Sequence, residues 1–218
     1  MKPTIGTEKV SPAIALALLD ALRASDTPSE VIEDESFRIS LPRRLGLNEV
    51  VDTQMRRYAE IRDRRGTISP DEYSSLLGLI DRRPDDAAVF AAAGRRLGES
   101  WFSKPGSLDR TRLRLTPAGL RRRKLVRAMR EAARALEPAA SIVPVMESDV
   151  IGIEVRDPPL ATTGGGSGCA LLTGVLEVCA ERRGLGNAQI LHPRCVARGD
   201  DHCRWVAAEG TEEEAAPE

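Results

Sequence analysis

The sequence predicts an α+β fold, in which helices pack on an antiparallel sheet and a helical N-terminal half precedes a β-β-α-β-β unit. Three observations predict it. Up to about Pro138, apolar residues recur at helical spacing behind well-marked helix starts. After it, short apolar segments come in pairs, each pair joined by a turn. A helical segment at residues 169–183 separates the two pairs, so the strands can form one sheet with a helix across it.

Capping residues mark the helices of the N-terminal half. Ser11-Pro12 provides a capping hydroxyl and a first-turn proline, and an apolar repeat follows. Ser69-Pro70 provides the same pair, followed by two acidic residues that favour a helix N-terminus. Further helices are predicted from Asn48 to about Arg64, over 85–102 with an alanine-rich face that allows close packing, and from Thr116-Pro117 to about Leu136. Residues 36–41 and 110–115 alternate enough to form short extended segments.

The C-terminal part reads as two hairpins around one helix. Strands are predicted at 141–146 and 150–155, and at 188–197 and 203–208. A glycine-rich link, 164–168, leads into the helix, and Gly184 and Gly186 close it. We divide the chain into a helical part (1–139), the β-β-α-β-β part (140–208) and an acidic tail (209–218), which has no core-forming residues and is expected to be disordered.

The composition is that of a globular protein with a core: 41% of the residues are hydrophobic and 30% are charged. A net charge of −1 provides no overall attraction for nucleic acid or an anionic membrane, and 3% aromatic residues argue against base stacking. Residues 10–24 are amphipathic and unlike a secretory leader, and no stretch approaches the roughly 20 apolar residues of a membrane span. We therefore expect a cytoplasmic location and reduced thiols.

All four cysteines lie in the last fifty residues. Cys195 and Cys203 stand eight positions apart across a Gly-Asp-Asp turn, so a hairpin would bring both sulfurs to one point. In a reducing compartment this clustering favours a shared metal over a disulfide. Cys179 follows Cys169 by ten positions, nearly three turns along the same helix, and is predicted to be a core residue.

The ending, with 168-GCALLTGVLEV-178 and 195-CVARGDDHCRW-205, resembles the 4-vinyl-reductase-like domain family. The family ends in a cysteine, a small residue, a glycine, an acidic or histidine position, and a second cysteine before an aromatic residue. The matching positions are Cys195, Ala197, Gly199, Asp200, Cys203 and Trp205. An upstream cysteine opens the family's helix ahead of a glycine, as Cys169 and Gly174 do here. The resemblance covers about residues 140–208.

The resemblance implies a small-molecule-binding module. The family includes bacteriochlorophyll biosynthesis accessory proteins and the sensor domains of phenol- and xylene-responsive activators. In the phenol-type sensors the matching cysteines and a hairpin carboxylate bind zinc, which here implies Cys169, Cys195, Cys203 and Glu147. Asp149 and His202 are alternative fourth ligands, and the thiols can also be plain core residues. The glutamate that those sensors carry before the first hairpin cysteine is replaced by Arg194.

The expected ligand is a small hydrophobic molecule held between sheet and helices, an aromatic compound or a tetrapyrrole, in a sensor or carrier. Leu172, Val175 and Leu176 form one stripe at helical spacing and, with Trp205, are the candidate lining residues. The competing interpretation is that this stripe fills a closed core. The resemblance also implies a homodimer, and signalling would need a separate partner protein.

Two other classes of function compete with this interpretation. A tetrapyrrole vinyl reductase, or its accessory subunit, would need a hydride source, but the sequence has no strand–GxGxxG–helix unit. A DNA-binding regulator could use the basic segment 110–134, which otherwise forms a solvated helix face. The glycine run 164–168 lacks the lysine and threonine of a phosphate-binding loop, so a flexible linker is expected there instead. No nucleophile with a histidine and acid partner is evident, so no catalytic residue is assigned.

Overall fold

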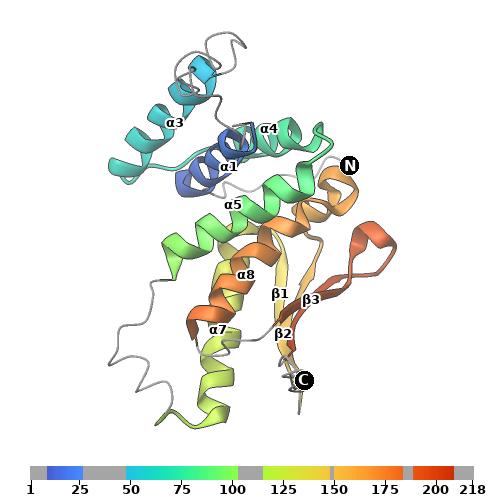
Figure 1. Cartoon of the computed structure of the whole chain (residues 1–218). Helices are drawn as coiled ribbons and strands as arrows, with labels where there is room; N and C mark the ends of the chain where they lie inside the picture. Colours follow the sequence, from blue (N-terminus) through green and yellow to red (C-terminus); the bar gives the residue numbers. More distant parts are fainter. Residues whose placement is uncertain (1–8, 27–47, 103–114, 148–149, 184–188, 209–218) are drawn as a thin grey trace, which may run out of the picture.

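The computed structural model describes residues 9–26, 48–102, 115–147, 150–183 and 189–208. It confirms the α+β class: a four-stranded antiparallel sheet is packed against helices from both parts of the chain (Figure 1). The buried apolar side chains run without a break from Val10 in the helical part to Ala207 in the last strand. The two parts of the chain therefore share one hydrophobic core.

The helices of the first part begin where the capping residues predict. Ser11 Oγ accepts a hydrogen bond from the Ala13 amide at 3.3 Å, and Ser69 Oγ accepts one from the Glu72 amide at 3.2 Å. The described helices of this part are α1 (Pro12–Ser25), α3 (Asn48–Asp63), α4 (Pro70–Asp81), α5 (Asp86–Trp101) and α7 (Ala118–Leu136).

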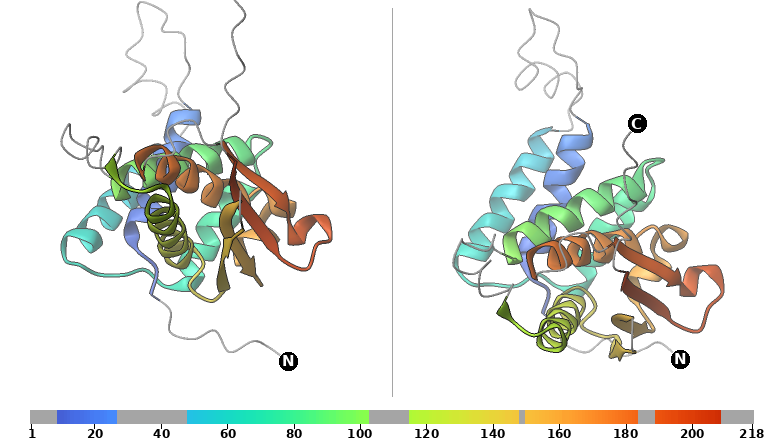
Figure 2. Two further views of the ribbon diagram at one scale, coloured as in Figure 1. Left: turned by 90° about the horizontal axis from the view of Figure 1, so that it is seen from below. Right: turned by 60° about the horizontal axis from the view of Figure 1, so that its bottom comes forward.

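The sheet has the strand order β1-β2-β4-β3, and each neighbouring pair is antiparallel. The strands are β1 (Ser141–Met146), β2 (Ile151–Arg156), β3 (Gln189–Arg194) and β4 (Cys203–Ala208). Helix α8 (Cys169–Arg183) joins the two hairpins and lies with α7 on one side of the sheet, as Figures 1 and 2 show. This is the predicted β-β-α-β-β arrangement.

Strand alternation decides which side chains of the sheet enter the core. On β4, Cys203, Trp205 and Ala207 are buried, whereas Arg204 between them lies on the opposite face. The register pairs Trp205 with the buried Ile153 of β2. One face of the sheet therefore packs on α7 and α8, and Cys203 enters that packed layer.

Helices α5 and α8 cross at a contact that only glycine allows. A Cβ atom on Gly94 would stand 2.1 Å from the carbonyl oxygen of Leu171, and one on Gly174 would stand 2.5 Å from that of Ala91. With no side chain at either position, the two backbones touch directly. This close crossing fixes the depth at which α8, with Cys169 in its first turn, sits in the core.

The glycine-rich link differs from its prediction as a plain flexible linker. It forms the end of a short 3₁₀ segment, η1 (Pro159–Gly166), which is interrupted where Gly164 and Gly165 adopt φ of 56° and 60°. The two left-handed residues turn the chain back toward α8, which only glycine does readily. Part of this link therefore has a defined backbone.

Several predictions fall on residues outside the described part of the chain. These are the extended segments 36–41 and most of 110–115, the closing glycines Gly184 and Gly186, and the acidic tail 209–218. Among the described helices, none is long and apolar enough to cross a membrane.

Candidate metal centre

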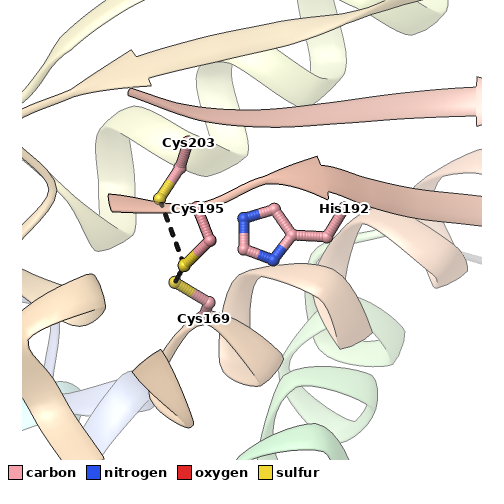
Figure 3. A group of neighbouring side chains, drawn as sticks. All are labelled: Cys169, His192, Cys195 and Cys203. Atoms are coloured by element: carbon pink, nitrogen blue, oxygen red, sulfur yellow. Dashed lines mark hydrogen bonds between the residues drawn. The ribbon is translucent and has the colours of Figure 1, made fainter. Parts of the chain in front are cut away.

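Four side chains with metal-ligand atoms meet beside the last hairpin (Figure 3). They are Cys169 at the start of α8, His192 on β3, Cys195 after β3 and Cys203 at the start of β4. The ligand atoms all lie within 4.8 Å of one another. Cys195 Sγ is central among the sulfurs, 4.0 Å from Cys169 Sγ and 3.8 Å from Cys203 Sγ. The three cysteines predicted to share a metal are thus brought together.

The loop between β3 and β4 holds its two cysteines side by side. Its 3₁₀ turn η2 (Val196–Arg198) ends at Gly199, whose φ of 95° reverses the chain. The Asp200 carboxylate accepts a 2.7 Å hydrogen bond from the Cys195 amide and so ties the two ends of the loop together. The Val196 amide lies 3.4 Å from Cys203 Sγ and donates to it. Such a donor stabilises negative charge on sulfur.

The three thiols are buried, and the pKa values of two of them, Cys169 and Cys203, shift in opposite directions. Cys169, Cys195 and Cys203 are between 0% and 4% exposed. Hydrogen bonding with the Cys169 thiol lowers the pKa of Cys203, and the same bond together with burial raises the pKa of Cys169. A cation inside the cluster would remove this conflict, because it stabilises all three thiolates at once.

The imidazole of His192 is positioned by a chain of contacts that returns to the cysteines. It stacks on Trp205 with ring centroids 4.2 Å apart and planes 5° from parallel. Trp205 Nε1 donates to Thr173 Oγ1 at 2.9 Å, and that hydroxyl donates to the Cys169 carbonyl oxygen at 3.1 Å. His192 Nε2 is buried and has no hydrogen-bond partner among the described residues. A buried nitrogen without a partner is costly, and a metal ion would satisfy it.

The predicted fourth ligand, Glu147, lies elsewhere. Its carboxylate is exposed and pairs with Arg204 at 2.7 Å, and it is not among the side chains that meet at the sulfurs. Asp149 falls outside the described residues. His202 is buried but faces other partners: its Nδ1 lies 2.6 Å from Asp201 Oδ1 and its Nε2 lies 3.5 Å from Glu154 Oε1. The structure thus brings together three of the four predicted ligands and adds His192.

The donor set fits a closed zinc site. Three thiolates and one imidazole are a common structural set for zinc, which takes four ligands in a tetrahedron. His192 was not among the ligands predicted from the sequence, although the strand pattern contains a signal for it. Ile190 faces the core, so alternation along β3 places His192 on the same face, three residues before Cys195.

The residues predicted to line a ligand site are all in the core. Leu172, Val175, Leu176 and Trp205 have no exposed surface and belong to the continuous apolar cluster. Cys179 is also buried, as its place on α8 predicts, and burial raises its pKa to about 12. Their burial fits the competing interpretation of a closed core. Trp205 stacks on His192 of the metal-ligand cluster.

No protein-family model and no curated protein matches this chain. Two solved structures are similar to it. A crystal structure of a mutant H-NOX protein from S. oneidensis in the Fe(II) ligation state has a TM-score of 0.44 and 13% identity, over 94% of this chain and 98% of that one. An NMR structure of an H-NOX domain from Shewanella oneidensis in the Fe(II)CO state has a TM-score of 0.43 and 16% identity, over 94% and 100%. At these scores the likeness carries no conclusion about ligand or function.

Proposed function

We propose that the chain is a small-molecule-binding module of the 4-vinyl-reductase-like kind, whose C-terminal part is held together by a structural zinc ion. The ligands are Cys169, His192, Cys195 and Cys203. The observation that carries the proposal is the convergence of four buried ligand atoms within 4.8 Å, from one helix and both strands of a hairpin. Convergence of this kind among reduced thiols is typical of a metal site.

The role of the metal is structural. Four protein ligands complete the tetrahedron, so no position remains for a reactive water. When bound, zinc would supply free energy of folding, because the unfolded chain holds no preformed site. The ligands would tie the start of α8 to both strands of the last hairpin. The stack of His192 on Trp205 would keep the imidazole pointed at the sulfurs.

Metal analysis of protein purified without chelator tests the ligand set. We expect about one zinc per chain, and loss of zinc in Cys195→Ser and in His192→Ala. Cys179→Ser is the matched control, because Cys179 is buried on α8 and stands outside the cluster. Glu147→Ala should keep its zinc, because Glu147 pairs with Arg204. A chain that lost zinc in Glu147→Ala and kept it in His192→Ala would restore the set implied by the resemblance.

The ligand of the module is proposed to be a small hydrophobic molecule, an aromatic compound or a tetrapyrrole, and the module itself a sensor or carrier. The resemblance of residues 140–208 supports this role, together with the buried apolar side chains by which α8 packs between α5, α7 and the sheet. The same resemblance supports a homodimer and a separate signalling or biosynthetic partner protein.

Binding of a dicarboxylic porphyrin, followed by its absorbance, and native mass spectrometry of the purified protein test this role. Val175→Trp places a large ring between α8 and its neighbours and should prevent uptake while zinc remains bound. Leu191→Trp is the control, because Leu191 lies on the opposite face of the sheet and is 40% exposed. Equal binding by both variants, or no bound molecule in any sample, would contradict the carrier role and leave the metal site untouched.

A further inference from the structure

Three side-chain oxygens from different elements converge beside the glycine-rich link. Each lies within 2.6 Å of the position that a Cβ atom would take on Gly164, and the three are Ser167 Oγ, Asp81 Oδ1 and Asp86 Oδ2. Asp81 ends α4, Asp86 begins α5, and Ser167 follows η1 just before α8. The segment η1 packs against α4, beside the α4–α5 corner (Figure 1). Two carboxylates and a hydroxyl therefore face one small space.

Two of these oxygens are buried without a hydrogen-bond partner. Asp81 Oδ1 and Ser167 Oγ form no hydrogen bond with any residue that the structure describes. Asp86 uses its other oxygen, Oδ1, to accept a 2.7 Å hydrogen bond from the Ala87 amide, which leaves Oδ2 facing the same space. A buried polar atom without a partner is costly, and a hydroxyl beside two carboxylates has acceptors close by. The arrangement indicates that the three oxygens share a further group.

The two carboxylates also have no counter-charge among the described residues. Neither Asp81 nor Asp86 forms an ion pair there. The neighbouring Arg83 pairs instead with Asp26 at 2.8 Å and with Asp85 at 2.7 Å. Two carboxylates that face one another raise each other's energy, and a cation between them would replace this repulsion with attraction. The charge of the group that fits this space is therefore positive.

The donor atoms favour a hard divalent cation. Ca²⁺ and Mg²⁺ are bound by carboxylate oxygens and water, and a serine hydroxyl is a recurring ligand of Mg²⁺. Zinc favours the sulfur and nitrogen donors that the cysteine cluster offers, and this space has neither. Gly164 and Gly165 are exposed, so water can reach the ion and complete its coordination. The oxygens fit the chemistry of Ca²⁺ or Mg²⁺ better than that of zinc.

We propose that Asp81, Asp86 and Ser167 form a second metal site, which binds one Ca²⁺ or Mg²⁺ ion. The ion joins the corner between α4 and α5 to the link that leads into α8. It therefore braces the segment just before Cys169 and contributes to the stability of the fold. The site is separate from the cysteine cluster, because none of its residues belongs to that cluster. Its failure would leave the proposed zinc site and ligand role untouched.

Thermal unfolding of the full, zinc-loaded chain tests the site. The buffer is first freed of divalent ions with a chelating resin, and millimolar Ca²⁺ or Mg²⁺ is then added. We expect one of the two ions to raise the melting temperature by several degrees, because an ion that binds only the folded chain stabilises it. The ion that acts at the lower concentration is the one the site prefers. Calorimetric titration should give about one such ion per chain.

Isosteric variants assign the effect to these residues. Asp81→Asn and Asp86→Asn each remove one charge and should abolish the rise in melting temperature, and Ser167→Ala should weaken ion binding severalfold. Asp71→Asn is the control, because Asp71 is an exposed carboxylate at the other end of α4, and it should keep the full rise. A rise that persists in both asparagine variants would show an adventitious ion bound elsewhere and would overturn the proposal. So would a natural chain that responds to neither ion.

Discussion

Glu137 provides a stringent test of the packing near Cys203 and the candidate metal centre. It is a carboxyl group only 1% exposed, between the end of α7 and η1. Its Oε1 accepts a 3.0 Å hydrogen bond from the Leu160 amide, whereas its Oε2 is buried with no partner in the described part of the chain. Burial raises the pKa of Glu137 from 4.5 to about 8, and the nearby Cys203 adds to the rise. The neutral acid is therefore the form that fits this site.

The sign and size of the effect follow from linkage. The folded-state pKa lies above the unfolded value, so the stability is fully present below about pH 4.5 and is lost as the pH rises toward about 8. Between those limits the loss is about 1.4 kcal/mol per pH unit, or on the order of 3 kcal/mol between pH 5 and pH 7. Glu137→Gln keeps the acceptor for Leu160 and removes the titration.

Urea unfolding of both proteins at a series of pH values, with zinc held constant, measures this difference. The variant should gain stability over the natural chain as the pH rises from about 5 to 7, by up to the same order of 3 kcal/mol. Other titrating groups act on both proteins and cancel in the comparison. Parallel stability curves for the two proteins would refute a neutral, buried Glu137.

The other predictions concern α8 and the cluster. Gly174→Ala should lower the free energy of unfolding by about 1–3 kcal/mol, because its Cβ would meet the Ala91 carbonyl oxygen at 2.5 Å. Gly78→Ala is the control, and it should be neutral or stabilising because nothing lies within 4 Å of the added Cβ. Chemical denaturation measures both variants. A chelator should lower the melting temperature of the natural chain and have no effect on Cys203→Ser, as thermal scans can show. Zinc binding should change the fluorescence of Trp205, because its ring stacks on a ligand, and zinc titration of a chain with Trp101→Phe would detect it.

Much of the fold could be predicted because local signals agree with it. The hydroxyls of Ser11 and Ser69 cap helices where the sequence places them, and the paired apolar segments after Pro138 form the two hairpins. For the crossing of α5 and α8, the sequence predicted only that the helix at 85–102 has an alanine-rich face that allows close packing. The need for Gly94 depends on the position of Leu171, a residue far along the chain, and no local pattern contains it.

The side-chain cluster of the candidate metal centre was predicted only in part, for a similar reason. Cysteine clustering pointed to Cys169, Cys195 and Cys203, since a hairpin joins the last two and the family pattern adds the first. The fourth position was assigned by resemblance to Glu147, whose carboxylate pairs with Arg204 instead. To predict His192 as a ligand, one must know which side chains of β3 face the core, and the buried Ile190 gives that information only once the structure is known.

X-ray absorption at the zinc edge tests the central claim most directly. With Cys169, His192, Cys195 and Cys203 as ligands, the spectrum of the purified protein should show three sulfur scatterers at about 2.3 Å and one nitrogen at about 2.0–2.1 Å. The outer-shell scattering of an imidazole should be present and should vanish in His192→Ala. A shell of light atoms without three sulfurs, or a spectrum with no imidazole scattering, would contradict the site.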